Sequence, residues 1–180
     1  MSRELEIASL YLLRAARCRE WNEAGRLLRD QPGLATYVDQ TGSNFAHLVA
    51  GIPGADEFIR SLAALGTSLN TKNLDRQTPL ESAIDSGRPS QESLKPNVEA
   101  LLSCGADPNL CTSYWCRPLQ LALHRNLDEH IEPLLEHGAD PCLSDEEYDS
   151  EDSIETARKL GNRASELLLA AVGRQGKTGQ

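Results

Sequence analysis

Aromatic side chains are scarce in this chain, which has 180 residues but only two Trp, four Tyr and two Phe. The cores of β-sandwiches are rich in β-branched and aromatic residues, so this scarcity argues against such a fold. Apolar residues nevertheless make up 39% of the chain. The core must therefore be built from leucine and alanine, a combination that favours packed helices.

Basic side chains are also in the minority, because 18 Lys and Arg stand against 27 Asp and Glu, for a net charge of −9. An acidic surface repels polyanions, so we expect no direct contact with nucleic acid. Long apolar runs are missing as well, and none approaches the ~18 residues that span a bilayer. The apolar run at residues 7–13 follows Glu4 and Glu6, where a signal peptide carries positive charge. We therefore expect a cytoplasmic protein that does not contact membranes.

The cysteines are too few and too scattered for a disulfide framework. They are Cys18, Cys104, Cys111, Cys116 and Cys142. Their odd number and irregular spacing favour reduced thiols. A zinc site built from Cys104, Cys111, Cys116 and His124 is the alternative, but zinc ligands come as close pairs and only Cys111 and Cys116 are near that spacing. The sequence therefore predicts neither a metal nor a cofactor.

A repeated pattern organises most of the chain. The string TPLESA at 78–83 matches RPLQLA at 117–122, and VEALLSCGADPN at 98–109 matches IEPLLEHGADPC at 131–142. The same frame fits near residues 44 and 152, so equivalent positions lie 34, 39 and 35 residues apart. Periods of this length are typical of stacked repeat architectures.

Each repeat predicts two short antiparallel helices. In the third repeat, Thr78 can cap a helix that begins with Pro79 and ends at Gly87. A second helix follows and ends at Gly105, which supplies the positive φ of a helix C-cap. We expect the inward faces of the two helices to be formed by Leu80, Ala83 and Ile84, and by Val98, Leu101 and Leu102.

These strings resemble the ankyrin repeat, whose pattern runs T-P-L-H-x-A and later G-A-D-x-N; the segment from Asp39 to Gly42 is similar to its D-x-x-G hairpin. The resemblance implies an all-α ankyrin-repeat solenoid of stacked helix-turn-helix units joined by β-hairpin-like loops. We count one domain at 1–173, with units at about 5–33, 39–71, 73–110, 112–142 and 148–172, and a flexible tail at 174–180. The chain departs from the pattern in an insertion between Arg88 and Lys95, in Arg117 where Thr is usual, and in a lengthened acidic hairpin at 144–152.

The four histidines do not indicate catalysis. The resemblance implies that His47 forms structural hydrogen bonds between a hairpin and a helix. His137 precedes Gly138 at a helix end, where a cation suits the helix dipole, and we expect His124 and His130 to lie in solvent. Since the sequence has no phosphate-binding glycine loop, G-x-S-x-G or H-E-x-x-H motif, we expect no enzyme.

The segment 142–157 holds seven carboxylates and no basic residue, so it alone carries −7 of the net charge. A calcium loop starting at Asp145 is excluded, because Ser150 stands where the turn needs Gly and Thr156 where a bidentate Glu belongs. Two interpretations stay open. The segment is a solvated loop, or it contacts a basic partner with Tyr148 as an anchor.

Adjacent aromatic residues, Tyr114 and Trp115, lie at the predicted tip of the preceding loop, where they pack locally or anchor a partner. Repeats of this kind bind proteins through loop tips and first helices. The candidate partner-binding residues are Asn73, Asp75, Arg76, Asp85, Tyr114, Trp115, Arg125, Asp145, Glu146, Glu147, Tyr148 and Asp149.

These features favour a non-enzymatic binding module that occludes or neutralises one protein partner, and we expect that partner to be a basic toxin or enzyme. The sequence does not determine the oligomeric state, and a monomer is favoured. The best interpretation is an immunity or antitoxin-type inhibitor, since ankyrin-like proteins are similar to some bacterial antitoxins. The alternatives are a host-directed effector, an inhibitor of a kinase or transcription regulator, and, from another class, a metal-dependent hydrolase that uses the acidic hairpin.

Overall fold

A computed structural model describes residues 3–87, 93–111, 116–144 and 151–175. Within these residues the chain forms ten α-helices, two 3₁₀ helices and no strand, which confirms the all-α prediction. The helices are α1 (Arg3–Arg17), α2 (Trp21–Asp30), η1 (Pro32–Thr36), α3 (Phe45–Ala50), α4 (Asp56–Ala64), α5 (Pro79–Ser86), α6 (Lys95–Ser103), α7 (Pro118–Arg125), η2 (Asp128–His130), α8 (Ile131–Glu136), α9 (Ser153–Leu160) and α10 (Arg163–Gln175).

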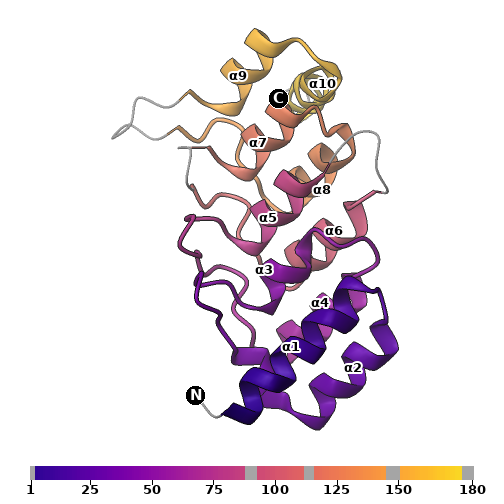
Figure 1. Ribbon diagram of the computed structural model, residues 1–180. Helices are drawn as coiled ribbons and strands as arrows, with labels where there is room; N and C mark the ends of the chain where they lie inside the picture. The colour runs from indigo at the N-terminus through magenta and orange to yellow at the C-terminus, as the bar shows by residue number, and fades with distance from the viewer. Residues whose placement is uncertain (1–2, 88–92, 112–115, 145–150, 176–180) are drawn as a thin grey trace.

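The helices form two rows that run the length of the molecule (Figure 1). In the first row, α1, α3, α5, α7 and α9 follow one another, each packed on the next. The second row contains α2, α4, α6, α8 and α10 in the same order. The segments that link one helix pair to the next lie together on one side, at the left in Figure 1. We call this the loop side.

Side-chain caps fix where the first-row helices begin. Asn44, Thr78 and Asp152 each accept a hydrogen bond from the backbone N–H three residues later, at 2.7 to 3.3 Å. Such caps satisfy N–H groups that have no partner inside the helix. Arg117 stands at the equivalent position before α7 and has no acceptor to offer. There the side chain of Gln120 makes the reverse bond of the capping box, since its Oε1 accepts from the Arg117 N–H at 2.9 Å, as Glu81 does from the Thr78 N–H.

The core between the rows consists mainly of leucine and alanine, as the composition predicts. All six predicted inward residues of α5 and α6 are buried. Gly105 has a φ of +96° at the end of α6, as its position predicts. Gly87 also ends α5, but with a φ of −62° rather than in the left-handed region.

Two asparagine side chains, Asn70 and Asn109, tie successive loops together. Asn70 donates to the carbonyl of Gly105 at 3.0 Å and accepts from the Asp107 N–H at 2.8 Å. Asn109 makes the same two bonds, at 2.8 and 2.9 Å, with the equivalent glycine and aspartate of the following loop. Because the recurring G-A-D string supplies both partners, the loops keep a common register along the molecule.

Candidate functional site

The structure describes five of the twelve predicted site residues. These are Asn73, Asp75, Arg76, Asp85 and Arg125. Tyr114, Trp115, Asp145, Glu146, Glu147, Tyr148 and Asp149 lie outside the described residues. The acidic hairpin and the aromatic loop tip therefore stay predictions.

Asn73 shapes its loop. Its Oδ1 accepts from the Gln77 N–H at 2.9 Å, and its Nδ2 donates to Ser43 Oγ of the preceding loop at 3.2 Å. The same turn holds Arg76 at a φ of +62°. The side chains of Asp75 and Arg76 are exposed at this turn, so of the three predicted residues these two are the ones placed to meet a partner.

Asp85 and Arg125 form an ion pair between α5 and α7 of the first row. Their side chains are 36% and 42% exposed. Pairs this accessible contribute little to stability, because water and salt screen them. The pair places charges of both signs on the exposed ridge of the first row, and either charge can exchange its partner for a group on another protein.

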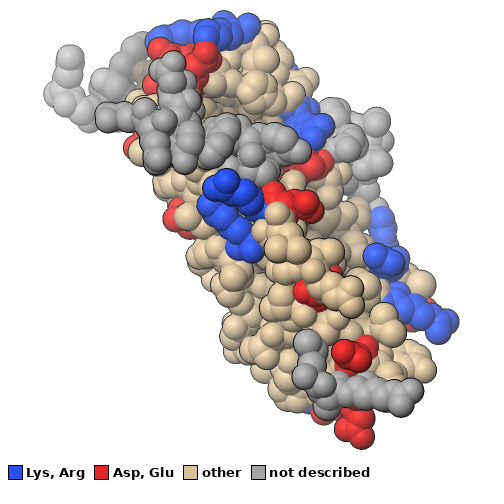
Figure 2. All heavy atoms as spheres, turned by 60° about the vertical axis from the view of Figure 1, so that its left-hand side comes forward, with Lys and Arg blue, Asp and Glu red and all other residues tan. Residues whose placement is uncertain are grey.

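The loop side also exposes apolar residues that we did not predict as site residues. In α1, Ile7, Leu10 and Tyr11 are 48%, 68% and 58% exposed. Val38 and Leu74, in the next two loops, are 46% and 76% exposed. We call these five residues the first-helix surface. Figure 2 turns the loop side toward the viewer, and most of the described surface there is neither acidic nor basic.

Contacts place Leu10 beside Val38, and the loop of Val38 beside that of Leu74. Leu10 and Val38 line one hollow of about 390 Å³, together with Glu6 and Tyr37. The backbone N–H of Leu74 donates to the carbonyl of Thr41 at 2.8 Å, so the loops that carry Val38 and Leu74 are adjacent. Residues 7, 10 and 11 share one face of α1 through their i, i+3, i+4 spacing, and Tyr11 lies at the edge of that face, where it lines a hollow with the buried Ala15.

The buried titratable groups on this side are structural. His47 Nε2 lies 3.1 Å from the carbonyl oxygen of Thr71 and 3.0 Å from that of Gln77, which confirms its predicted role. Burial lowers the pKa of His47. Burial, with a smaller effect of Glu81, raises the pKa of the Cys116 thiol to about 12. A thiol that keeps its proton is a poor nucleophile at neutral pH.

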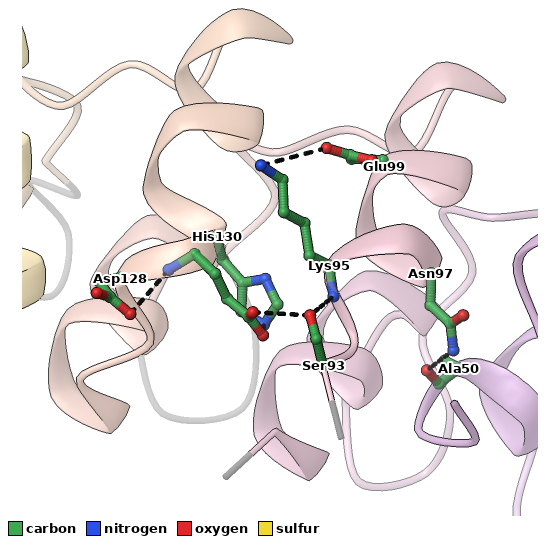
Figure 3. A network of polar contacts seen from close by, with 8 residues as sticks. Ala50, Ser93, Lys95, Asn97, Glu99, Asp128 and His130 are labelled. Carbon is green, nitrogen blue, oxygen red and sulfur yellow. Dashed lines mark hydrogen bonds and ion pairs between the residues drawn. The ribbon is translucent and has the colours of Figure 1, made fainter. Parts of the chain in front are cut away.

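The prediction for His130 was wrong. His130 is fully buried, and neither ring nitrogen has a hydrogen-bond partner within the described residues. The short η2 helix turns the ring into the space between α6 and α8, beside Lys95 (Figure 3). His124 is exposed as predicted, and His137 Nδ1 lies 2.9 Å from the carbonyl of Pro133 at the end of α8.

Comparison of the sequence with models of known protein families and with curated proteins finds no match. Across the described residues, no three or more His, Cys, Asp or Glu side chains gather in a group that could hold a metal ion. None of the helices in this part of the chain is long and apolar enough to cross a membrane.

Proposed function

We propose that this protein is a non-enzymatic ankyrin-repeat module that binds another protein through its loop side. Two stacked rows of short helices, capped at equivalent positions and linked by equivalent loops, support the ankyrin-type solenoid. The buried imidazole of His47, bonded to the next loop, supports it as well. Repeat stacks of this kind use loops and first helices as an extended binding surface.

The observation that carries the proposal is the first-helix surface. Exposed apolar residues that lie together are unusual on a monomer unless a partner covers them. Leu10 and Leu74 are each more than half exposed and lie on the side where the loops meet. Tyr11, also more than half exposed, continues this surface along α1 toward α2. Aromatic and aliphatic anchors of this size dominate the energy of protein interfaces. The arrangement favours a partner that places an apolar patch over α1 and the first two loops.

The partner that suits this protein best is basic, since the chain carries a net charge of −9, of which −7 belongs to the segment 142–157 rather than to α1. Complementary charge speeds association, while the apolar contacts hold the complex. An acidic protein that covers the surface of one basic toxin or enzyme in the cytoplasm acts as an immunity or antitoxin-type inhibitor. We therefore propose neutralisation by occlusion as its role.

The test compares capture of proteins from a lysate of the source cells by three forms of the chain. The variant Leu10→Ser/Leu74→Ser removes two apolar anchors from the first-helix surface. Leu65→Ser is the matched control, because Leu65 is 41% exposed at the end of α4 in the other row. We expect one protein to be captured by the wild type and the control and lost by the double variant. Equal capture by all three forms would place the interface elsewhere.

A further inference from the structure

A groove between α8 and α10 lies in the second row, away from the first-helix surface. It encloses about 430 Å³ where η2 and α8 face α10, and Lys95 of α6 lies at its edge. Its apolar lining includes Leu135 from α8 and Leu167 and Ala171 from α10. All three are partly exposed. An apolar side chain from a partner could therefore remove further apolar area from water there.

The wall formed by η2 and α8 is acidic. Asp128, Glu132 and Glu136 line the groove, each four residues from the next. Within the described residues, none of the three forms an ion pair with a basic side chain. Glu129, the fourth carboxylate of the lining, accepts a hydrogen bond from Ser93 Oγ at 2.7 Å. Three carboxylates therefore face the groove with their charge uncompensated by a cation.

Two basic residues line the groove against these carboxylates. Lys95 extends toward Glu99 of its own helix (Figure 3), and their charged atoms are 3.7 Å apart. The charge of Lys95 is thus already shared with a residue outside the lining. Arg174 of α10 is exposed, and its Nε donates to the carbonyl of Ala170 at 3.2 Å. The groove keeps an excess of negative charge.

One carboxylate of the acidic wall, Glu136, does not serve the stability of α8. Glu136 is the last residue of this helix, where the macrodipole is negative and a carboxylate is unfavourable. Glu132 and Glu136 also repel each other, because residues four apart on a helix are neighbours. Only the carboxylates near the start of α8 suit the dipole. Helix stability therefore does not explain the position of Glu136.

We propose that the α8–α10 groove binds a basic segment of a partner polypeptide, with basic side chains on the carboxylates and an apolar side chain on Leu135, Leu167 and Ala171. Four residues of helix rise about 6 Å, so a partner helix with basic residues at every fourth position matches the wall. A second copy of this chain is a poor occupant, because it brings the same negative charge. Polyanions are repelled for the same reason.

The test uses a labelled synthetic helical peptide with arginine at every fourth position and leucine beside each arginine, followed by fluorescence anisotropy. We expect Glu132→Gln/Glu136→Gln to bind this peptide about tenfold more weakly than the wild type. The same variant should unfold at a slightly higher temperature, since a repulsion within α8 is removed. Weaker binding by a more stable protein excludes misfolding as the cause. Arg174→Glu adds a carboxylate to the opposite wall and should tighten binding.

The matched control is Asp56→Asn/Glu57→Gln, which removes the same charge from α4 of the same row. It should leave peptide affinity unchanged. If both pairs of substitutions weakened binding equally, the peptide would be held by the general negative charge of the protein, and the proposal would be overturned. Absence of peptide binding by the wild type, or weaker binding by Arg174→Glu, would also overturn it. A wild type that dimerises through Glu132 and Glu136 would also overturn it, in favour of a second copy. Since no first-helix residue is changed, failure here leaves the proposed function standing.

Discussion

Replacing His130 with leucine tests whether a polar ring without a hydrogen bond weakens this core. The ring is fully buried, and Oε1 of Glu129 lies 3.9 Å from its Nε2, too far for a hydrogen bond. A buried polar group without a hydrogen bond costs about 1–3 kcal/mol, and repacking around a side chain of similar volume costs less than about 1.5 kcal/mol. His130→Leu should therefore raise the free energy of unfolding by about 1 kcal/mol, a rise in Tm of about 2–4 °C for a chain of this length.

The gain should grow as the solution becomes more acidic. Burial lowers the pKa of His130, and the opposing effects of Glu129 and Asp128 do not outweigh it; Lys95 lowers it further. Below about pH 6.5 the unfolded chain binds a proton at this residue before the folded chain does, so the wild type loses stability as the pH falls toward the lower folded pKa. His130→Leu removes this loss. His47, whose pKa is also lowered, is present in both proteins, so each keeps part of the dependence of stability on pH.

The measurement is urea unfolding of wild type and variant at about pH 7.5 and about pH 5.5, on either side of the ordinary histidine pKa. Unchanged slopes with denaturant allow the midpoints to be compared directly. His124→Leu serves as the control, since that ring is exposed and should show no gain that depends on pH. A lower midpoint for His130→Leu at both pH values, or an equal gain at both, would refute the reasoning.

Two further residues give independent tests of the core. Burial raises the pKa of Glu81 to about 8, so wild-type stability should fall as the pH rises from about 4.5 to about 8. Glu81→Gln, which can still accept from the Thr78 N–H, should remove that decline from thermal unfolding curves; parallel curves would contradict this. Asn97 Nδ2 donates to the carbonyls of Ala50 and Ile52 at 2.9 and 2.8 Å. Asn97→Ala should lower the free energy of unfolding, measured in urea, by about 2 kcal/mol. A loss below about 0.5 kcal/mol, as at a surface site, would show that these two hydrogen bonds do not stabilise the fold.

Local structure was predictable at those positions of the repeat where a helix end needs a particular residue type. Thr78 caps α5 because a hydroxyl three residues before a free N–H accepts from it, and that requirement is visible in the string itself. The same holds for Gly105, whose positive φ follows from its place after a helix. Such signals depend only on residues close in the sequence, so the prediction holds whichever element packs against the helix.

Burial at the edges of the repeat was not predictable, because it depends on neighbouring helices. His130 lies in a segment that looks like a solvated turn, and only the packing of η2 on α6, α7 and α10 buries it. Residues 7, 10 and 11 of α1 belong to an apolar run in the sequence. The run alone does not show which side of the helix is covered by a neighbouring helix. The first helix has no preceding repeat within the described residues, so part of its apolar surface stays exposed.

The two proposed surfaces can be separated by salt. Contacts of the groove carboxylates are exposed and are screened over about 8 Å at physiological ionic strength, so affinity for the arginine peptide should fall as salt is added. Burial of Leu10, Tyr11 and Leu74 removes apolar area from water, which salt does not screen. A natural complex that survives high salt but is lost in Leu10→Ser/Leu74→Ser depends on the first-helix surface. A complex that dissociates with salt and is weakened by Glu132→Gln/Glu136→Gln depends on the groove. A complex that is weakened by salt and by both double variants has a partner that reaches from one row of helices to the other.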